Sequence, residues 1–371
     1  MAAASAGRDA PGCARPGRTD PARRVPSTRG LNVLKTTQMR LAALAVAATL
    51  GAGAQAAQTI TGAGSTWVYP LVAKWSTVYA KNTGIQVNYQ SIGSGGGIAQ
   101  IKAGTVAFGA SDKPLTPAEL AQSNLIQFPT AIAGEDVVYN VPGIKPGELV
   151  LSGPVVADIF MGKVKSWNDP EIAHLNRGVK LPAMPITVVH RSDGSGTTFT
   201  FANYLSKVSP EWKTRIGADT SIAWPTGVGG KGNEGVASYV QRIKGAVGYV
   251  EYAYIIENHM AYARMLNSAG KVVSPSLAGF QAAAANVDFT KAEDFYVILT
   301  DQPGAASWPI SGCTWQILRK SAPKATNASV TAFFRWGFEH GQDIARSIAF
   351  GPLPPSTIHA IEAYWKKNLG I

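Results

Sequence analysis

The sequence predicts an α/β protein in which strands and helices alternate around a largely parallel sheet. Two observations support this class. Short runs with the apolar or alternating pattern of strands occur at 85–89, 106–110 and 186–189, and helical periodicity lies between them. Three loops rich in Gly, Ser and Thr also follow strand-like runs and open helix-like ones. Such loops fall beyond the carboxyl ends of strands, where α/β folds bind ligands.

The helices are expected from the spacing of the apolar residues. At 68–79 these residues follow the i, i+3, i+4, i+7 pattern, and Pro70 is tolerable because it falls in the first turn. Further helices are expected at 98–103, 198–205 and 236–242. Strands that alternate with helices in this way favour α/β layers.

Composition and charge set broad limits on the class of protein. The chain has 371 residues, of which 46% are hydrophobic, so it can bury a large core and is long enough for about two domains. Residues 1–56 carry a net +6 of the total +11, which leaves +5 for the rest. Beyond residue 56 the basic residues are scattered singly, without the dense basic stripe of a nucleic-acid surface, so no nucleic-acid partner is expected.

The N-terminal segment has the pattern of an export signal. Lys35 and Arg40 form a positive flank, 41–50 is an apolar run, and Ala-Gln-Ala at 54–56 fits a small-x-small cleavage site. The apolar run is too short for a membrane span, which needs about 20 residues. We therefore expect a periplasmic protein that is cleaved near Ala56.

The residues before this signal have no periodicity. Residues 1–38 are rich in Ala, Pro and Arg, and Met39 stands directly before the signal. We expect a signal peptide at 39–56, with 1–38 either an unstructured extension or a stretch upstream of a true start at Met39; a long functional signal is the alternative. After cleavage Cys313 is the remaining cysteine, which leaves no disulfide within the chain and no lipid-anchoring cysteine after the apolar run.

Each of the three loops is a candidate binding site for an anion. They lie at 61–66, 93–97 and 191–197. At a helix start the backbone N–H groups are unpaired and the helix dipole adds positive partial charge. Ordinary structural roles are also open, since Ser65 and Thr66 could cap a helix and 93–97 could be a flexible turn. The third loop favours binding, because an Arg, an Asp and two hydroxyls stand around its glycines. Together the loops indicate a receptor for a small tetrahedral anion.

Asp112 would identify the anion if it faces the same cleft. A carboxylate repels a fully ionised anion but accepts a hydrogen bond from an anion that still carries a proton. Phosphate keeps such a proton near neutral pH, whereas sulfate does not. Asp112 could instead cap the turn before Pro114 or the helix that starts near Pro117, and the sequence leaves both interpretations open.

Five segments, in order, resemble the motifs of the periplasmic phosphate-binding receptor of the high-affinity phosphate ABC transporter. They are Thr-Gly-Ala-Gly-Ser-Thr-Trp at 61–67, Ile-Gly-Ser-Gly-Gly-Gly at 92–97, Phe-Gly-Ala-Ser-Asp at 108–112, Arg-Ser-Asp-Gly-Ser-Gly-Thr at 191–197 and Trp-Pro-Thr-Gly-Val-Gly-Gly-Lys-Gly-Asn-Glu-Gly at 224–235. The resemblance covers the chain from about residue 59 onward. Two positions depart from the family pattern: Trp67 stands where Phe is usual, and Gly95 where Ser is frequent.

The resemblance implies a two-lobed periplasmic-binding-protein fold, of the Venus-flytrap type II kind, with two hinge crossings. Lobe I would consist of 57–134 plus 312–371 and lobe II of 135–311. The crossings would lie near 133–136 and 310–314. The lobes would close over one phosphate ion.

The resemblance also implies the residues that bind phosphate. Thr66 would donate from its hydroxyl and Trp67 from its backbone, and Asp112 would accept the phosphate proton. Arg191 would be the charged donor, held in place by Asp193. The full set of implied phosphate-binding residues is Thr66, Trp67, Ser94, Asp112, Arg191, Ser195, Gly196 and Thr197.

The function implied is that of a monomeric receptor that captures inorganic phosphate and delivers it to an inner-membrane ABC permease. No catalytic residue, cofactor or metal is expected. The chain lacks a Gly-x-Ser-x-Gly elbow, and its five histidines form no metal-ligand pair on one helix turn. We read His190, the histidine nearest the loops, as strand packing. The alternatives are a secreted phosphate-ester hydrolase and a receptor for another oxyanion.

Overall fold

The computed structural model describes residues 59–371. The expected signal peptide at 39–56 and the segment 1–38 lie outside the described residues. Within 59–371, no helix has both the length and the apolar character that crossing a membrane requires.

The described chain alternates strands and helices as the sequence predicts. The strands are β1 (Thr59–Gly64), β2 (Gln86–Ser91), β3 (Phe108–Ser111), β4 (Leu125–Tyr139), β5 (Val150–Ser152), β6 (Thr187–Arg191), β7 (Val228–Gly230), β8 (Ala246–Glu251), β9 (Ala261–Tyr262), β10 (Arg264–Leu266), β11 (Val272–Val273) and β12 (Ser311–Arg319). The helices are α2 (Tyr69–Thr83), α3 (Ser94–Ala103), α4 (Pro117–Ser123), α5 (Gly153–Phe160), α6 (Pro170–Leu175), α7 (Gly196–Val208), α8 (Pro210–Arg215), α9 (Gly232–Arg242), α10 (Tyr252–Asn258), α11 (Leu277–Ala284), α12 (Lys324–His340), α13 (Gln342–Ser347) and α14 (Pro355–Leu369), with short 3₁₀ turns η1 (Phe289–Lys291) and η2 (Glu293–Phe295).

The main sheet is mixed, which corrects the expectation of a largely parallel one. Its order is β2-β1-β3-β12-β4-β8-β6-β7, and β9 pairs with β4. At one end β1 is parallel to β2 and β3, and at the other β6 is parallel to β7 and β8. In the middle, β12 is antiparallel to β3 and β4, and β4 is antiparallel to β8. The expectation fails there because β12 returns from late in the chain and inserts between β3 and β4.

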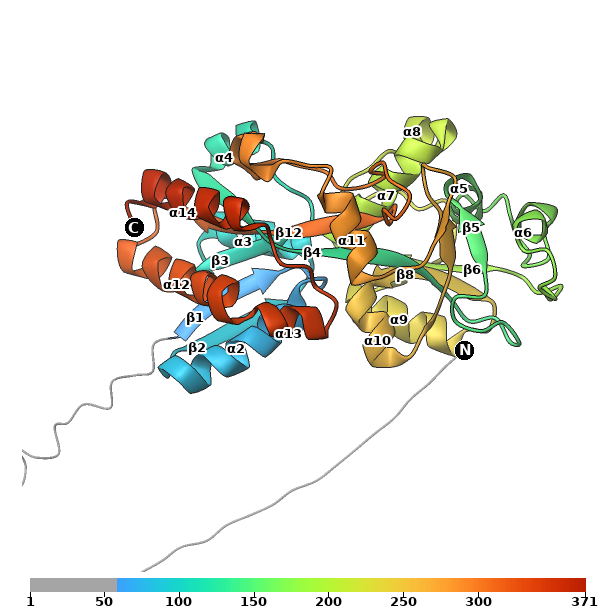
Figure 1. The fold of residues 1–371 in the computed structure, drawn as a ribbon, viewed down its shortest axis with the longest axis horizontal. Helices are drawn as coiled ribbons and strands as arrows, with labels where there is room; N and C mark the ends of the chain where they lie inside the picture. The colour runs from blue at the N-terminus through green and yellow to red at the C-terminus, as the bar shows by residue number, and fades with distance from the viewer. Residues whose placement is uncertain (1–58) are drawn as a thin grey trace, which may run out of the picture. The chain divides into compact units, whose positions relative to one another are not determined.

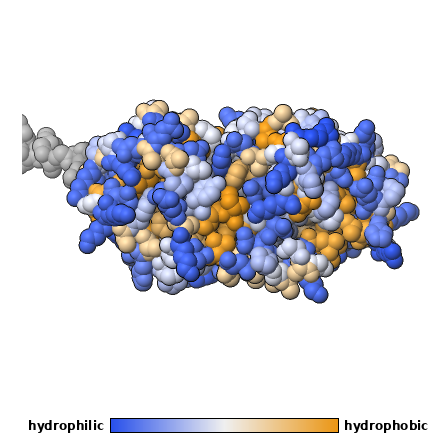
Figure 2. Space-filling model, turned by 90° about the horizontal axis from the view of Figure 1, so that it is seen from above, coloured by the Kyte–Doolittle hydropathy of each residue, from blue (hydrophilic) through white to orange (hydrophobic). Residues whose placement is uncertain are grey.

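Strand β4 connects the two halves of this sheet. Its residues 125–134 face β12, whereas 135–139 face β8, and the whole strand is buried. In Figure 1, α2, α3, α12 and α14 surround the half that contains β1–β3, and α5, α7 and α9 surround the half that contains β6 and β8. We call these the first half and the second half. Figure 2 shows a mostly hydrophilic surface with hydrophobic residues gathered near the middle of the face in view.

The helices that matter for the site begin earlier than the periodicity predicts. Helix α3 begins at Ser94 rather than at 98, α7 at Gly196 rather than at 198, and α9 at Gly232 rather than at 236. Glycine is a poor helix former, so a Gly-rich first turn reads as a loop. As a consequence, the loop residues form the first turns of helices, where N–H groups lack intrahelical acceptors.

Candidate anion-binding site

Two Gly-rich segments, one from each half, meet main chain to main chain. The N–H of Gly95 donates to the carbonyl of Gly194 at 2.9 Å. A Cβ atom added to Gly196 would lie 2.5 Å from Ser94 Oγ and 2.6 Å from the backbone nitrogen of Asp112. Only glycine fits such an approach, so these glycines bring the start of α7 against the start of α3 and the end of β3.

Asp112 lies at the centre of this contact and is buried. Its Oδ1 accepts hydrogen bonds from Ser65 Oγ and Thr314 Oγ1, both at 2.5 Å, and its Oδ2 accepts a longer one from Ser94 Oγ at 3.3 Å. Burial raises the pKa of Asp112 to about 6, and the three hydroxyl donors together with Arg191 limit this rise. The carboxylate is therefore ionised above about pH 6, and its Oδ2 keeps the larger unused accepting capacity.

Arg191 lies at the end of β6 and is buried, and its charge acts on Asp112 by lowering the pKa of that carboxyl. Its Nε and Nη2 donate to the two oxygens of Asp193 at 2.8 and 2.6 Å, and its Nη1 donates to Thr197 Oγ1 at 3.1 Å. Asp193 also accepts from the N–H of Gly232 at 3.0 Å. Burial opposes ionisation of Arg191, but the pair with Asp193 raises its pKa above the ordinary value. The guanidinium is thus a fixed cation with spare N–H groups.

Helix α7 adds backbone donors on the same side. Its N-cap Ser195 accepts from the N–H of Thr198 at 3.0 Å, so the helix begins with the N–H groups of Gly196 and Thr197. Thr197 is buried and its hydroxyl contacts Arg191. This first turn therefore combines unpaired donors, a hydroxyl and a guanidinium.

Thr66 reaches the same place from the first half. Its Oγ1 accepts from the backbone and side-chain nitrogens of Asn233 at 3.2 and 2.7 Å. Its carbonyl accepts from the Tyr254 hydroxyl at 2.6 Å. Both partners belong to the second half, so Thr66 is fixed by residues from across the contact.

Trp67 is placed differently from the expectation of a free backbone donor. Its N–H donates to Ser65 Oγ at 3.0 Å. Its buried ring packs against Gly312, where an added Cβ would lie only 2.5 Å from the ring. In this conformation the Trp67 N–H already has an acceptor. Its contact with a ligand stays a prediction.

The structure thus brings the predicted residues Thr66, Ser94, Asp112, Arg191, Ser195, Gly196 and Thr197 together, with Asp193 behind Arg191. The sequence reasoning missed three contributors: Ser65 as a donor to Asp112, Thr314 and Asn233. Asn233 lies within the segment 224–235 that carried the resemblance, so a signal existed for it. Thr314 had no local signal, because it reaches Asp112 from 202 residues away through a β-bulge in β12.

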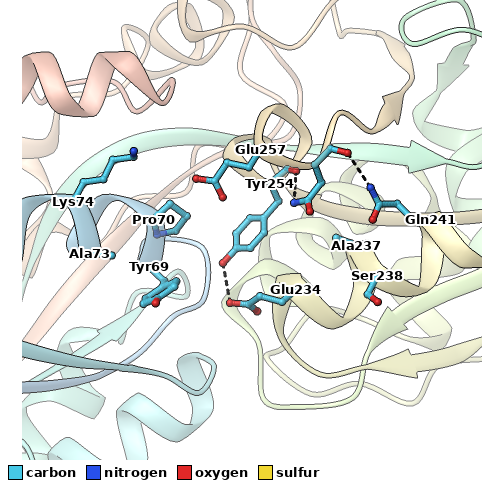
Figure 3. Close-up of a pocket in the computed structure, with 11 residues that line it drawn as sticks. Tyr69, Pro70, Ala73, Lys74, Glu234, Ala237, Ser238, Gln241, Tyr254 and Glu257 are labelled. Atoms are coloured by element: carbon cyan, nitrogen blue, oxygen red, sulfur yellow. Dashed lines mark hydrogen bonds between the residues drawn. The ribbon is translucent and has the colours of Figure 1, made fainter.

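A groove adjoins the site and is lined from both halves. It has a volume of about 560 Å³ and is lined by Tyr69, Pro70 and Lys74 of α2 opposite residues of α9 and α10. Figure 3 shows the side chain of Tyr254, from α10, between Pro70 and Glu234. Its hydroxyl has two acceptors for its one hydrogen, the Thr66 carbonyl at 2.6 Å and the more distant Glu234 Oε1 at 3.1 Å. Tyr254 therefore separates this groove from the buried polar cluster.

The described residues offer no metal centre. Within 59–371 no group of three His, Cys, Asp or Glu side chains is placed to hold a metal ion. His190 is half-buried and stacks on Trp224 with ring centroids 4.8 Å apart. Burial lowers its pKa, so it is neutral at pH 7 and packs in the second half.

The mixed sheet and the buried donors at the meeting of its halves define the class of two-lobed periplasmic-binding proteins. In agreement, the family model described as PBP superfamily domain matches residues 51–339. The chain is 54% identical to Phosphate-binding protein PstS of Xylella fastidiosa (strain 9a5c), over 82% of this chain and 84% of that protein. It is also 54% identical to Phosphate-binding protein PstS of Pasteurella multocida (strain Pm70), over 84% of this chain and 91% of that protein. The chain belongs to the PstS family of phosphate-binding proteins.

A solved structure shows the same fold at lower identity. The phosphate-binding protein from Stenotrophomonas maltophilia aligns with a TM-score of 0.61 and 20% identity, covering 83% of this chain and 94% of that one. This likeness concerns the fold.

Proposed function

We propose that this protein captures inorganic phosphate between its two lobes and delivers it to an inner-membrane ABC permease for import. One observation carries the proposal. A buried carboxylate with spare accepting capacity, Asp112, stands among donors from Thr66, Arg191 and the start of α7. The family membership supports the same conclusion, because the relatives bear the name of phosphate-binding proteins.

The balance of donors and acceptors suits phosphate more than sulfate. Several donors match the ionised oxygens of either anion, but Asp112 needs a ligand that donates a proton. Phosphate has one near neutral pH. A fully ionised anion would instead place an oxygen against a carboxylate in a buried site, where unpaired charges are costly.

Delivery would use the two-lobed architecture. We assign 57–134 plus 312–371 to lobe I and 135–311 to lobe II, since β4 changes partner from β12 to β8 between 134 and 135. The contacts of Gly95 with Gly194 and of Thr66 with Asn233 join the lobes. Ligand binding that favours these contacts would shift the population toward a closed form, which the permease would recognise. In this proposal the protein acts as a periplasmic monomer.

The test is titration calorimetry on the purified protein beginning at Ala57, after dialysis to remove bound phosphate. Tight phosphate binding and weak sulfate binding at pH 8 are expected. Asp112→Asn should reduce this discrimination between the two anions, and Asp343→Asn is its matched control, because this carboxylate is exposed and pairs with Arg346. Equal affinity for the two anions would favour a general oxyanion receptor, and steady phosphate release from a phosphomonoester would favour a hydrolase.

A further inference from the structure

Asn233 is completely buried in the first turn of α9 and touches both halves of the molecule. Its Oδ1 accepts from the backbone N–H of Glu251 at 3.0 Å. Because a backbone N–H can only donate, this contact determines which end of the side-chain amide is oxygen. The Nδ2 group therefore points the other way, toward the buried polar cluster.

This Nδ2 group contacts two threonine hydroxyls, one from each half. It lies 2.7 Å from Thr66 Oγ1 and 3.3 Å from Thr197 Oγ1. Each hydroxyl also accepts a second N–H, from the Asn233 backbone in one case and from Arg191 in the other. A hydroxyl has two lone pairs and one hydrogen, so both oxygens are filled as acceptors and each keeps only its hydrogen to offer.

We infer that Asn233 is a positioning residue that fixes the hydroxyls of Thr66 and Thr197 as donors toward the bound anion. This inference rests on the proposed function and deepens it. With both hydroxyls held as donors, Asp112 is the acceptor that the site presents to the ligand. The site then fits an oxyanion with one proton and otherwise ionised oxygens.

A double-mutant cycle tests this role through phosphate affinity. Thr66→Val removes the hydroxyl at nearly constant shape and should weaken binding roughly 10- to 150-fold, the range for one hydrogen bond to a charged group. Asn233→Asp supplies an acceptor that turns the Thr66 hydrogen away from the ligand. In the Asn233→Asp background, Thr66→Val should weaken phosphate binding by less than about threefold. Comparing the effect of Thr66→Val in the two backgrounds cancels the repulsion between the added negative charge and phosphate.

Tyr254→Phe is the matched control. It removes another bond from the second half to Thr66, but to the carbonyl rather than to the hydroxyl. In this background Thr66→Val should keep its full effect. Additive effects of Asn233→Asp and Thr66→Val would overturn the inference, while failure of the unmodified protein to bind phosphate would overturn the proposed function instead.

A measurement on the unmodified protein covers the case in which Asn233→Asp does not fold. Neutron diffraction from the deuterated phosphate complex would locate the hydroxyl deuterium atoms. We expect those of Thr66 and Thr197 to point at phosphate oxygens. Deuterium atoms directed at Asn233 would contradict the inference.

Discussion

The proposed site predicts most directly that Asp112 rejects sulfate, and Asp112→Asn is the perturbation that tests this prediction. Ser65 and Thr314 both donate to Oδ1, so the amide oxygen of asparagine should take that position. The amide nitrogen would then occupy the position of Oδ2, which accepts only the long bond from Ser94. A group that repels a fully ionised anion would be replaced by one that donates to it.

The size of the effect follows from one hydrogen bond. A bond to a charged partner contributes about 1.5–3 kcal/mol, so sulfate should bind the variant roughly 10- to 150-fold more tightly at pH 8. Phosphate should change by less than about tenfold, because it exchanges one bond with Asp112 for another with the amide. Titration calorimetry measures both affinities, and Asp343→Asn should change neither.

The pH dependence provides a second arm of the same experiment. Burial raises the pKa of Asp112 to about 6, so the protonated form, which can donate, accumulates below this pH. In the unmodified protein sulfate affinity should therefore rise as the pH falls from 8 to 5, and in Asp112→Asn it should stay nearly constant. Sulfate affinity that is independent of pH in the unmodified protein and unaltered in the variant would refute the reasoning.

Three further predictions concern stability and closure. Glu135 is fully buried, neither of its carboxyl oxygens has a partner, and burial raises its pKa well above the ordinary value. In the folded state this carboxyl stays protonated at pH values where the unfolded chain already ionises, so the unmodified protein loses stability as the pH rises from the ordinary pKa toward the raised one. Glu135→Gln removes this loss, so its free energy of unfolding in urea should rise relative to that of the unmodified protein between pH 4 and pH 8. A difference that stays constant with pH would contradict this. Gly196→Ala places a Cβ 2.5 Å from Ser94 Oγ, so the two halves should no longer meet. Several hydrogen bonds to the ligand, each of about 1.5 kcal/mol or more, would then be lost, and phosphate binding measured by calorimetry should weaken more than roughly 100-fold. Unchanged affinity would show that the contact is dispensable. Asp193→Asn leaves the buried Arg191 without its ion pair and should lower the free energy of unfolding by about 3 kcal/mol, whereas a loss below about 1 kcal/mol would mean that the pair contributes little.

The loops and their place at strand-to-helix junctions could be predicted from the sequence, because glycines and hydroxyls interrupt the apolar periodicity of the strands and helices on either side. Helix starts could not, since Gly232 and Gly196 lower helix propensity at the very turns that carry the site. The alternation of strands and helices is therefore predictable from the sequence, but the first turns of α3, α7 and α9 are not.

Contributions that depend on distant chain segments were not accessible to local patterns. Thr314 reaches Asp112 only because β12 inserts between β3 and β4 and bulges at that point. Nothing in the residues around 314 indicates this pairing. Asn233 does lie in a segment that carries the resemblance, but its contact with Thr66, 167 residues away, is not encoded by any sequence spacing.

The contact between Gly95 and Gly194 sets a mechanical stop to the approach of the halves. Because both partners are main chain, 2.9 Å apart, the stop is set by atomic radii and not by adaptable rotamers. The width available to an ion between the halves is then set by backbone atoms and does not adjust to the ion. An oxyanion with longer bonds to its central atom would hold the two glycines apart, and the hydrogen bond between them would be lost. The protein would then discriminate ions by size through two residues that have no side chain.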